Sequence, residues 1–212
     1  MQTLTTETIV ALLTFFGCFY GYHFVYFYIS RRRAQATRKG RMRQAVAGAL
    51  AQAIEEGDYL LVVHQLRNII MSVTFLASAS VLLLGFIISF SGVWEAIIEL
   101  PQLPSRGLRP QDYPIWTIIF TLAVSFFSFL VALRYFNLLS VLISAPAKAL
   151  HEMEGTEPLK YLTDLFMRGS DSYTLGRRGF IYSVVASVWF FNVWVFIAVT
   201  VLVTVWVAIF DR

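Results

Sequence analysis

A few arginine, asparagine and histidine side chains are the residues of this sequence best suited to chemistry. Arg67 is followed directly by Asn68, and Arg134 is followed three residues later by Asn137. Guanidinium and amide groups donate several hydrogen bonds, so such pairs can hold carboxylate or phosphate oxygens. The candidates for binding a ligand or a lipid headgroup are Arg67, Asn68, Arg134, Asn137, His64, Arg177 and Arg178.

Two interpretations of these arginines stay open. In the first, they cap helix carbonyls or extend to lipid phosphates, as long cationic side chains do near a bilayer. In the second, they surround a small anion, as arginine does in anion-selective pores. No acidic residue is expected at the depth of Arg67 and Arg134, so the second interpretation predicts one anionic group shared between them.

Known catalytic and metal-binding patterns do not fit the sequence. The pair His151–Glu152 lacks the second histidine that a zinc-protease helix requires. The chain has one cysteine, Cys18, and neither a Cys/His cluster nor a glycine-rich phosphate loop. We therefore expect no catalytic residue, no metal and no cofactor, and hence no enzyme.

The elements that must position the arginines are long apolar helices. The chain is 58% hydrophobic and 14% charged, and its apolar runs are long enough to cross a bilayer. The sequence predicts an all-α polytopic membrane protein in a single domain of four long transmembrane helices. The expected spans are 8–30, 69–91, 115–134 extending to 145, and 190–210 extending back to 179.

The distribution of basic residues predicts the orientation of these spans. Eight Lys and Arg fall between residues 31 and 68, two between 92 and 114, and five between 146 and 178. Short basic loops remain cytoplasmic. We expect an inner-membrane protein with both termini outside and basic loops inside, in contact with anionic lipid. The net charge of +4 reflects this asymmetry, and we expect no nucleic-acid partner.

Excess helix length predicts a small cytoplasmic layer. The apolar runs exceed the hydrocarbon thickness of about 30 Å, so their inner turns are expected to project into the cytoplasm. The stretches 59–63, 136–143 and 180–185 would pack there with two short helices. Those helices are predicted over about 44–56 and 156–168, the first ending at Gly57 and the second at Gly169. Asp58 can cap the helix that follows Gly57. Trp189 would mark the inner boundary and Trp206 the outer one.

Small residues recur on one face of the second and third spans. Such faces let helix backbones approach closely in lipid, where the hydrophobic effect does not drive association. We interpret them as packing faces, within the protein or between copies, and a pore lining is the alternative. The residues concerned are Thr74, Ser78, Gly85 and Ser89 on the second span, and Thr121, Ser125 and Ser128 on the third.

The sequence resembles a known family, domain of unknown function 599, whose members are polytopic membrane proteins. The resemblance is carried by LRNIIMSVTFLASASVLLLG (66–85), LRYFNLLSVLISAP (133–146), TLGRRGFIYS (174–183) and the terminal Asp211. It implies a four-helix membrane protein and brings no established activity.

Two functions from different classes fit these observations. The first is a homo-oligomeric channel or transporter for a small anionic solute, because four helices enclose a conduit only in several copies. The alternative is a non-catalytic accessory or structural subunit of a larger membrane complex, or a protein that organises lipid. The alternative rests on the absence of an acidic gating residue from the predicted spans.

Overall fold

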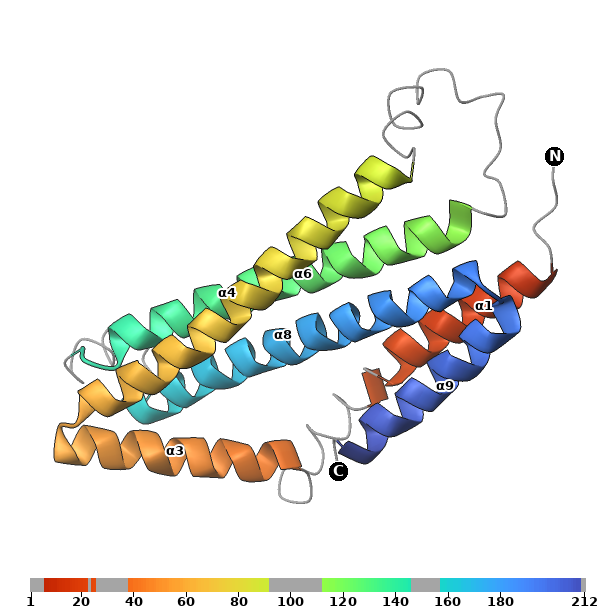
Figure 1. Ribbon diagram of the computed structural model, residues 1–212. Coiled ribbons are helices and arrows are strands. Elements are labelled where there is room, and N and C mark those ends of the chain that lie inside the picture. The colour runs from red at the N-terminus through yellow and green to blue at the C-terminus, as the bar shows by residue number, and fades with distance from the viewer. Residues whose placement is uncertain (1–5, 23, 26–37, 92–111, 146–156, 211–212) are drawn as a thin grey trace. The chain divides into compact units, whose positions relative to one another are not determined.

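The computed structural model describes residues 6–22, 24–25, 38–91, 112–145 and 157–210. All regular structure in that part of the chain is helical, which confirms the all-α class. Arg31–Arg33, residues 92–111 of the predicted outer loop (92–114), His151 and Asp211 lie outside it. The elements are α1 (Thr6–Phe16), the π-helix η1 (Gly17–Gly21), α3 (Arg38–Glu56), α4 (Tyr59–Phe90), α6 (Asp112–Leu142), α8 (Pro158–Ser187), the 3-10 helix η4 (Val188–Phe190) and α9 (Val193–Phe210) (Figure 1).

Two of these helices have the length and apolar composition needed to cross a membrane. They are α4 and α6, which contain the predicted second and third spans. The helices of the first and last runs are apolar but shorter, over Thr6–Gly21 and Val193–Ile209. Membrane-length helices are therefore found for two of the four predicted spans.

The chain divides into two compact units, to which α4, α6 and α8 all contribute. Unit 1 comprises residues 1–27, 78–126 and 177–212, and unit 2 comprises residues 28–77 and 127–176. Residues 180–185 belong to unit 1, and the stretches 59–63 and 136–143 belong to unit 2. The predicted cytoplasmic layer of these three stretches stays a prediction.

The turn between α3 and α4 in unit 2 follows its local sequence. Gly57 has φ of 70°, a left-handed conformation that glycine adopts without steric cost and that ends many helices. The Leu61 amide donates to Asp58 Oδ1 at 3.4 Å at the start of α4. Gly57 and Asp58 were predicted to end one helix and cap the next, and both roles are confirmed.

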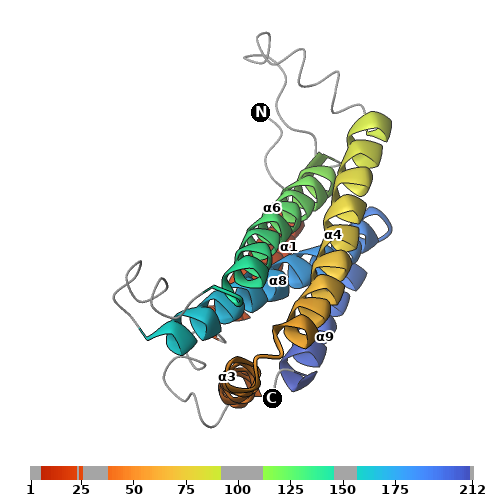
Figure 2. The same cartoon turned by 90° about the vertical axis from the view of Figure 1, so that its left-hand side faces the viewer.

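The predicted helix end at Gly169 is wrong, because α8 continues through Gly169 and Gly176 to Ser187. Both glycines allow α8 to approach α6 closely in unit 2 (Figure 2). A Cβ at Gly169 would lie 2.8 Å from the Phe136 ring, and one at Gly176 would lie 2.7 Å from the Phe129 ring. These glycines therefore serve helix packing, and the predicted loop at 170–178 is helical.

The prediction of one continuous helix over 179–210 is also wrong. In unit 1, α8 ends at Ser187, η4 follows, and α9 begins at Val193. Asn192 Oδ1 accepts hydrogen bonds from the amides of Trp194 at 2.8 Å and Val195 at 3.3 Å. Asparagine at this N-cap position satisfies the free amides of a new helix, so the chain turns here.

This turn changes the direction of the last helix. Within unit 1, α9 lies beside α1 and the two helices run in the same direction (Figure 1). The predicted outside C-terminus, and the assignment of Trp189 and Trp206 to the inner and outer boundaries, assumed a straight fourth span. The last span is not straight, so the predictions for the C-terminus, Trp189 and Trp206 are no longer supported.

Candidate functional site

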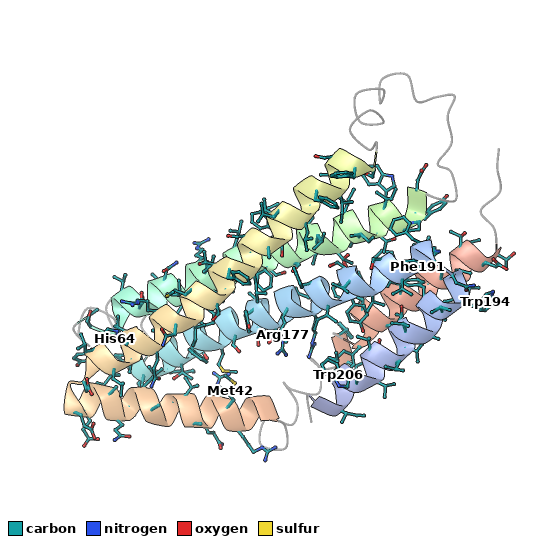
Figure 3. The ribbon with its side chains drawn as sticks, in the orientation of Figure 1. Met42, His64, Arg177, Phe191, Trp194 and Trp206 are labelled. Atoms are coloured by element: carbon teal, nitrogen blue, oxygen red, sulfur yellow. The ribbon has the colours of Figure 1, made fainter. Side chains whose placement is uncertain are left out.

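The predicted anion-binding residues of unit 2 lie on the exposed sides of their helices. His64, Arg67 and Asn68 are exposed on α4, and Arg134 and Asn137 are exposed on α6. Figure 3 shows His64 in the first turns of α4. Within the described part of unit 2, the side chains of Arg67 and Arg134 make no hydrogen bond or ion pair. The anion shared between these two arginines stays a prediction.

The adjacent arginines of α8 have opposite environments within unit 1. Arg177 is exposed and projects from α8 (Figure 3), whereas Arg178 is only 2% exposed. The Arg178 guanidinium lies over the Tyr22 ring, 5.0 Å from its centroid, a geometry in which the ring face attracts the cation. The sequence placed both arginines in a polar segment ahead of the fourth span, so the burial of Arg178 was not predicted.

An aromatic cluster surrounds the next turn of α8 in unit 1. Tyr182 makes edge-to-face contacts with Phe15 of α1 and Phe19 of η1, at centroid distances of 5.7 and 5.2 Å. Its hydroxyl is 2.6 Å from Thr204 Oγ1 on α9. Phe15 also stacks on Phe196 of α9 at 5.7 Å. Tyr182 thereby links α1, α8 and α9 through contacts between segments that no local sequence pattern could pair.

The two predicted small-residue faces differ in burial. Thr121, Ser125 and Ser128 of α6 are buried, and a Cβ at Gly179 of α8 would lie 3.2 Å from Ser125 Cβ. The corresponding residues of α4 are all exposed, and a Cβ added at Gly85 would meet nothing within 4 Å. We call this the open α4 face, defined by Arg67, Thr74, Ser78, Gly85 and Ser89.

Many hydroxyls inside unit 1 bond to their own helices. Thr117 donates to the Tyr113 carbonyl and Thr121 to the Thr117 carbonyl, both at 2.8 Å. Thr200 of α9 donates to the Phe196 carbonyl at 2.8 Å. Such bonds let a threonine be buried without water, so this polar face needs no aqueous channel beside it.

An ion pair that the sequence analysis missed joins α3 to α8 in unit 2. The Arg43 guanidinium donates to Asp164 Oδ1. The two residues are 121 positions apart, so no local pattern could pair them. Both side chains are partly exposed, and an ion pair in such a position contributes little to stability. Elsewhere in the described part, no group of three His, Cys, Asp or Glu side chains could hold a metal ion.

These observations define the class of the protein as an all-helical chain with apolar helices of membrane length. Residues 10–212 match the family described as "Protein of unknown function, DUF599". The chain belongs to this family, as the resemblance of its motifs implied. No curated protein and no solved structure matches the chain.

Proposed function

We propose that the protein is a multi-pass membrane protein that assembles from identical copies through the open α4 face and carries a small anionic solute. The single observation that supports this proposal is the exposure of Arg67 on the same face of α4 as the small residues. The helix is apolar and of membrane length, so its exposed side faces either lipid or another protein.

The spacing of the open α4 face suits close helix packing. Its positions are separated by seven, four, seven and four residues, the period at which one side of a helix meets a partner. A neighbouring side of α4, with Leu66, Val73 and Ala77, is buried within the chain. Small residues at such a period permit backbones to approach and helices to associate in lipid.

Assembly through this face would also create the anion site. Copies related by symmetry would bring their Arg67 side chains close together. Like charges repel unless an anion lies between them, and the guanidinium fork holds carboxylate or phosphate oxygens in pairs. A conduit between copies is favoured over one within a copy, because the polar face of α6 is buried and its threonines are already bonded.

Solute flux in proteoliposomes containing the pure protein tests this function. The expected result is anion flux that Arg67→Gln abolishes and Arg67→Lys reduces, since lysine keeps the charge but not the fork. Arg168→Gln is the matched control, because Arg168 is an exposed arginine on α8 and should leave flux unchanged. Absence of flux for every small anion tried would exclude a channel or transporter.

The open α4 face equally suits a helix of a different protein. In that case the chain is an accessory or structural subunit of a larger complex, or an organiser of lipid. The mass of the complex extracted gently from membranes separates the candidates. A homo-oligomer supports the first function, and a defined complex with another subunit supports the second.

The orientation follows from the basic segment together with the turn before α9. We infer that Arg31–Arg43 is cytoplasmic. Since α9 runs beside α1 in the same direction, the C-terminus would then also be cytoplasmic. Labelling single cysteines at positions 36 and 212 with an impermeant reagent, in a Cys18→Ser background, should succeed only after cells are opened. Labelling of position 36 in intact cells would contradict this orientation.

A further inference from the structure

The turn between α8 and α9 presents large aromatic side chains to its surroundings. Phe190, Phe191 and Trp194 are 56%, 88% and 60% exposed, and we call these three residues the aromatic turn. Phe191 and Trp194 lie together at this end of unit 1 (Figure 3). Their neighbour Trp189 is instead buried and stacks on Phe196 at 4.8 Å. The turn is therefore held from inside by one tryptophan while three other rings face outward.

The backbone of the turn is hydrogen-bonded within itself. The amides of Phe191 and Asn192 donate to the Val188 carbonyl, at 3.0 and 3.4 Å, and the Phe196 amide donates to the Asn192 carbonyl at 3.0 Å. The Asn192 side chain accepts from two further amides at the start of α9. Internal bonding of this kind lets irregular backbone approach lipid, where an unpaired amide is costly.

The exposed surface of α9 continues from the aromatic turn. It is aliphatic and carries no charged residue over the 18 residues of the helix, a length of about 27 Å at 1.5 Å per residue. Trp206, half exposed, lies towards the other end. Aromatic side chains at both ends of an apolar helix are typical of the two interfaces of a bilayer. The large exposed aliphatic residues between them are Val195, Val201, Leu202 and Val205, and exposed Ile209 follows Trp206.

We propose that the aromatic turn inserts into the boundary between headgroups and acyl chains of one leaflet, with lipid as its partner. The apolar surface of the turn is continuous with the charge-free surface of α9, so one bilayer covers both. The tryptophan presents an apolar body and an N–H that bonds to headgroup oxygens, which places it at this boundary. This inference rests on the membrane placement proposed above, and it does not depend on the transported solute or on the number of copies.

Depth measurement by electron paramagnetic resonance tests the insertion. A spin label on Phe191→Cys, in a Cys18→Ser background, is measured with the full chain in phosphatidylcholine vesicles. Dissolved oxygen, which concentrates in lipid, should reach this label better than a water-soluble nickel complex does. We expect a depth of about 5–10 Å below the phosphates. Gln44→Cys, exposed on α3, is the control site and should favour the nickel complex.

A second label keeps the test decisive if the first variant does not fold. Leu202→Cys, which lies between the two exposed tryptophans of α9, should be accessible to oxygen and deeper than residue 191. Nickel access at residue 191 equal to that of the control would place the turn in water and overturn the proposal. Protection from both reagents would show that protein covers the turn, which would equally overturn it.

Discussion

The small-residue faces of α4 and α6 differ although their sequences are alike. Both repeat serine, threonine or glycine at helical spacing in an apolar helix. The face on α6 is buried within the chain, whereas the one on α4 is open. Of the most apolar 18 residues of each helix, 44% are buried in α6 and only 17% in α4. The comparison teaches that the same residue pattern can be buried on one helix and exposed on another.

The largest expected effect is on the buried face. Ser125→Leu should destabilise the fold by about 1–3 kcal/mol, because added methylenes in a packed interior force strain and Ser125 lies against Gly179. Thermal unfolding in detergent measures this loss. The matched control is Ser78→Leu on the open α4 face, which should unfold like the parent protein. Equal loss in both variants would remove the distinction between the faces.

Glycine substitutions on α8 and α4 provide a second test of the difference between packed and open helix faces. Gly176→Ala should also destabilise by about 1–3 kcal/mol, since its Cβ would lie 2.7 Å from the Phe129 ring. Gly85→Ala, with open space around it, should instead stabilise by about 0.5–1 kcal/mol through reduced backbone entropy of the unfolded chain. The unfolding temperatures of the two variants should therefore shift in opposite directions. Shifts of the same sign would contradict the assigned packing.

The open α4 face should affect association and not folding. The double variant Ser78→Leu/Gly85→Leu should weaken self-association by about 1–2 kcal/mol, the scale of a lost membrane helix contact. Mass measurement in detergent should then detect smaller species with unchanged helix content. The control is Leu202→Ala on the exposed side of α9. An unchanged mass for the double variant would show that this face does not mediate self-association.

The contact between the hydroxyls of Tyr182 on α8 and Thr204 on α9 is expected to contribute to the stability of unit 1. Tyr182→Phe should cost about 1 kcal/mol, the net value of one buried hydrogen bond. Thr204→Val removes the other partner of the 2.6 Å contact. If the two hydroxyls act on each other, the double variant should lose less stability than the sum of the single losses. Full additivity would show that the link contributes nothing.

The smallest effect is expected at the exposed ion pair of unit 2. Arg43→Gln should lower the free energy of unfolding by only about 0–1 kcal/mol, because solvent screens partly exposed charges. Asp164→Asn should have the same effect, and the loss should shrink at high salt. Arg41→Gln, also exposed on α3, is the control. A loss of several kcal/mol would show that the pair is far better shielded than its exposure indicates.

Local chemistry determined what the sequence predicted correctly. The α3–α4 turn followed from Gly57 and Asp58, because a left-handed glycine and a capping carboxylate act within a few residues. The membrane-length helices α4 and α6 followed from their apolar composition alone. Asn192 carried the same type of local signal, since it precedes an apolar run, and it was overlooked within a longer hydrophobic stretch.

Only the tertiary structure decided which faces meet. Glycine often marks the end of a helix, but α8 continues through Gly169, where the ring of Phe136, far away in sequence, packs against the backbone. Arg178 is polar and follows a polar segment, yet Tyr22, directly after η1, places its ring over the guanidinium. The sequence period of a helix indicates which residues share a face, but the burial of a face depends on which other helix packs against it. Contacts between segments that are distant in the sequence decide which faces become buried. They bury the α6 face and leave the α4 face exposed, a difference that the sequence alone could not predict.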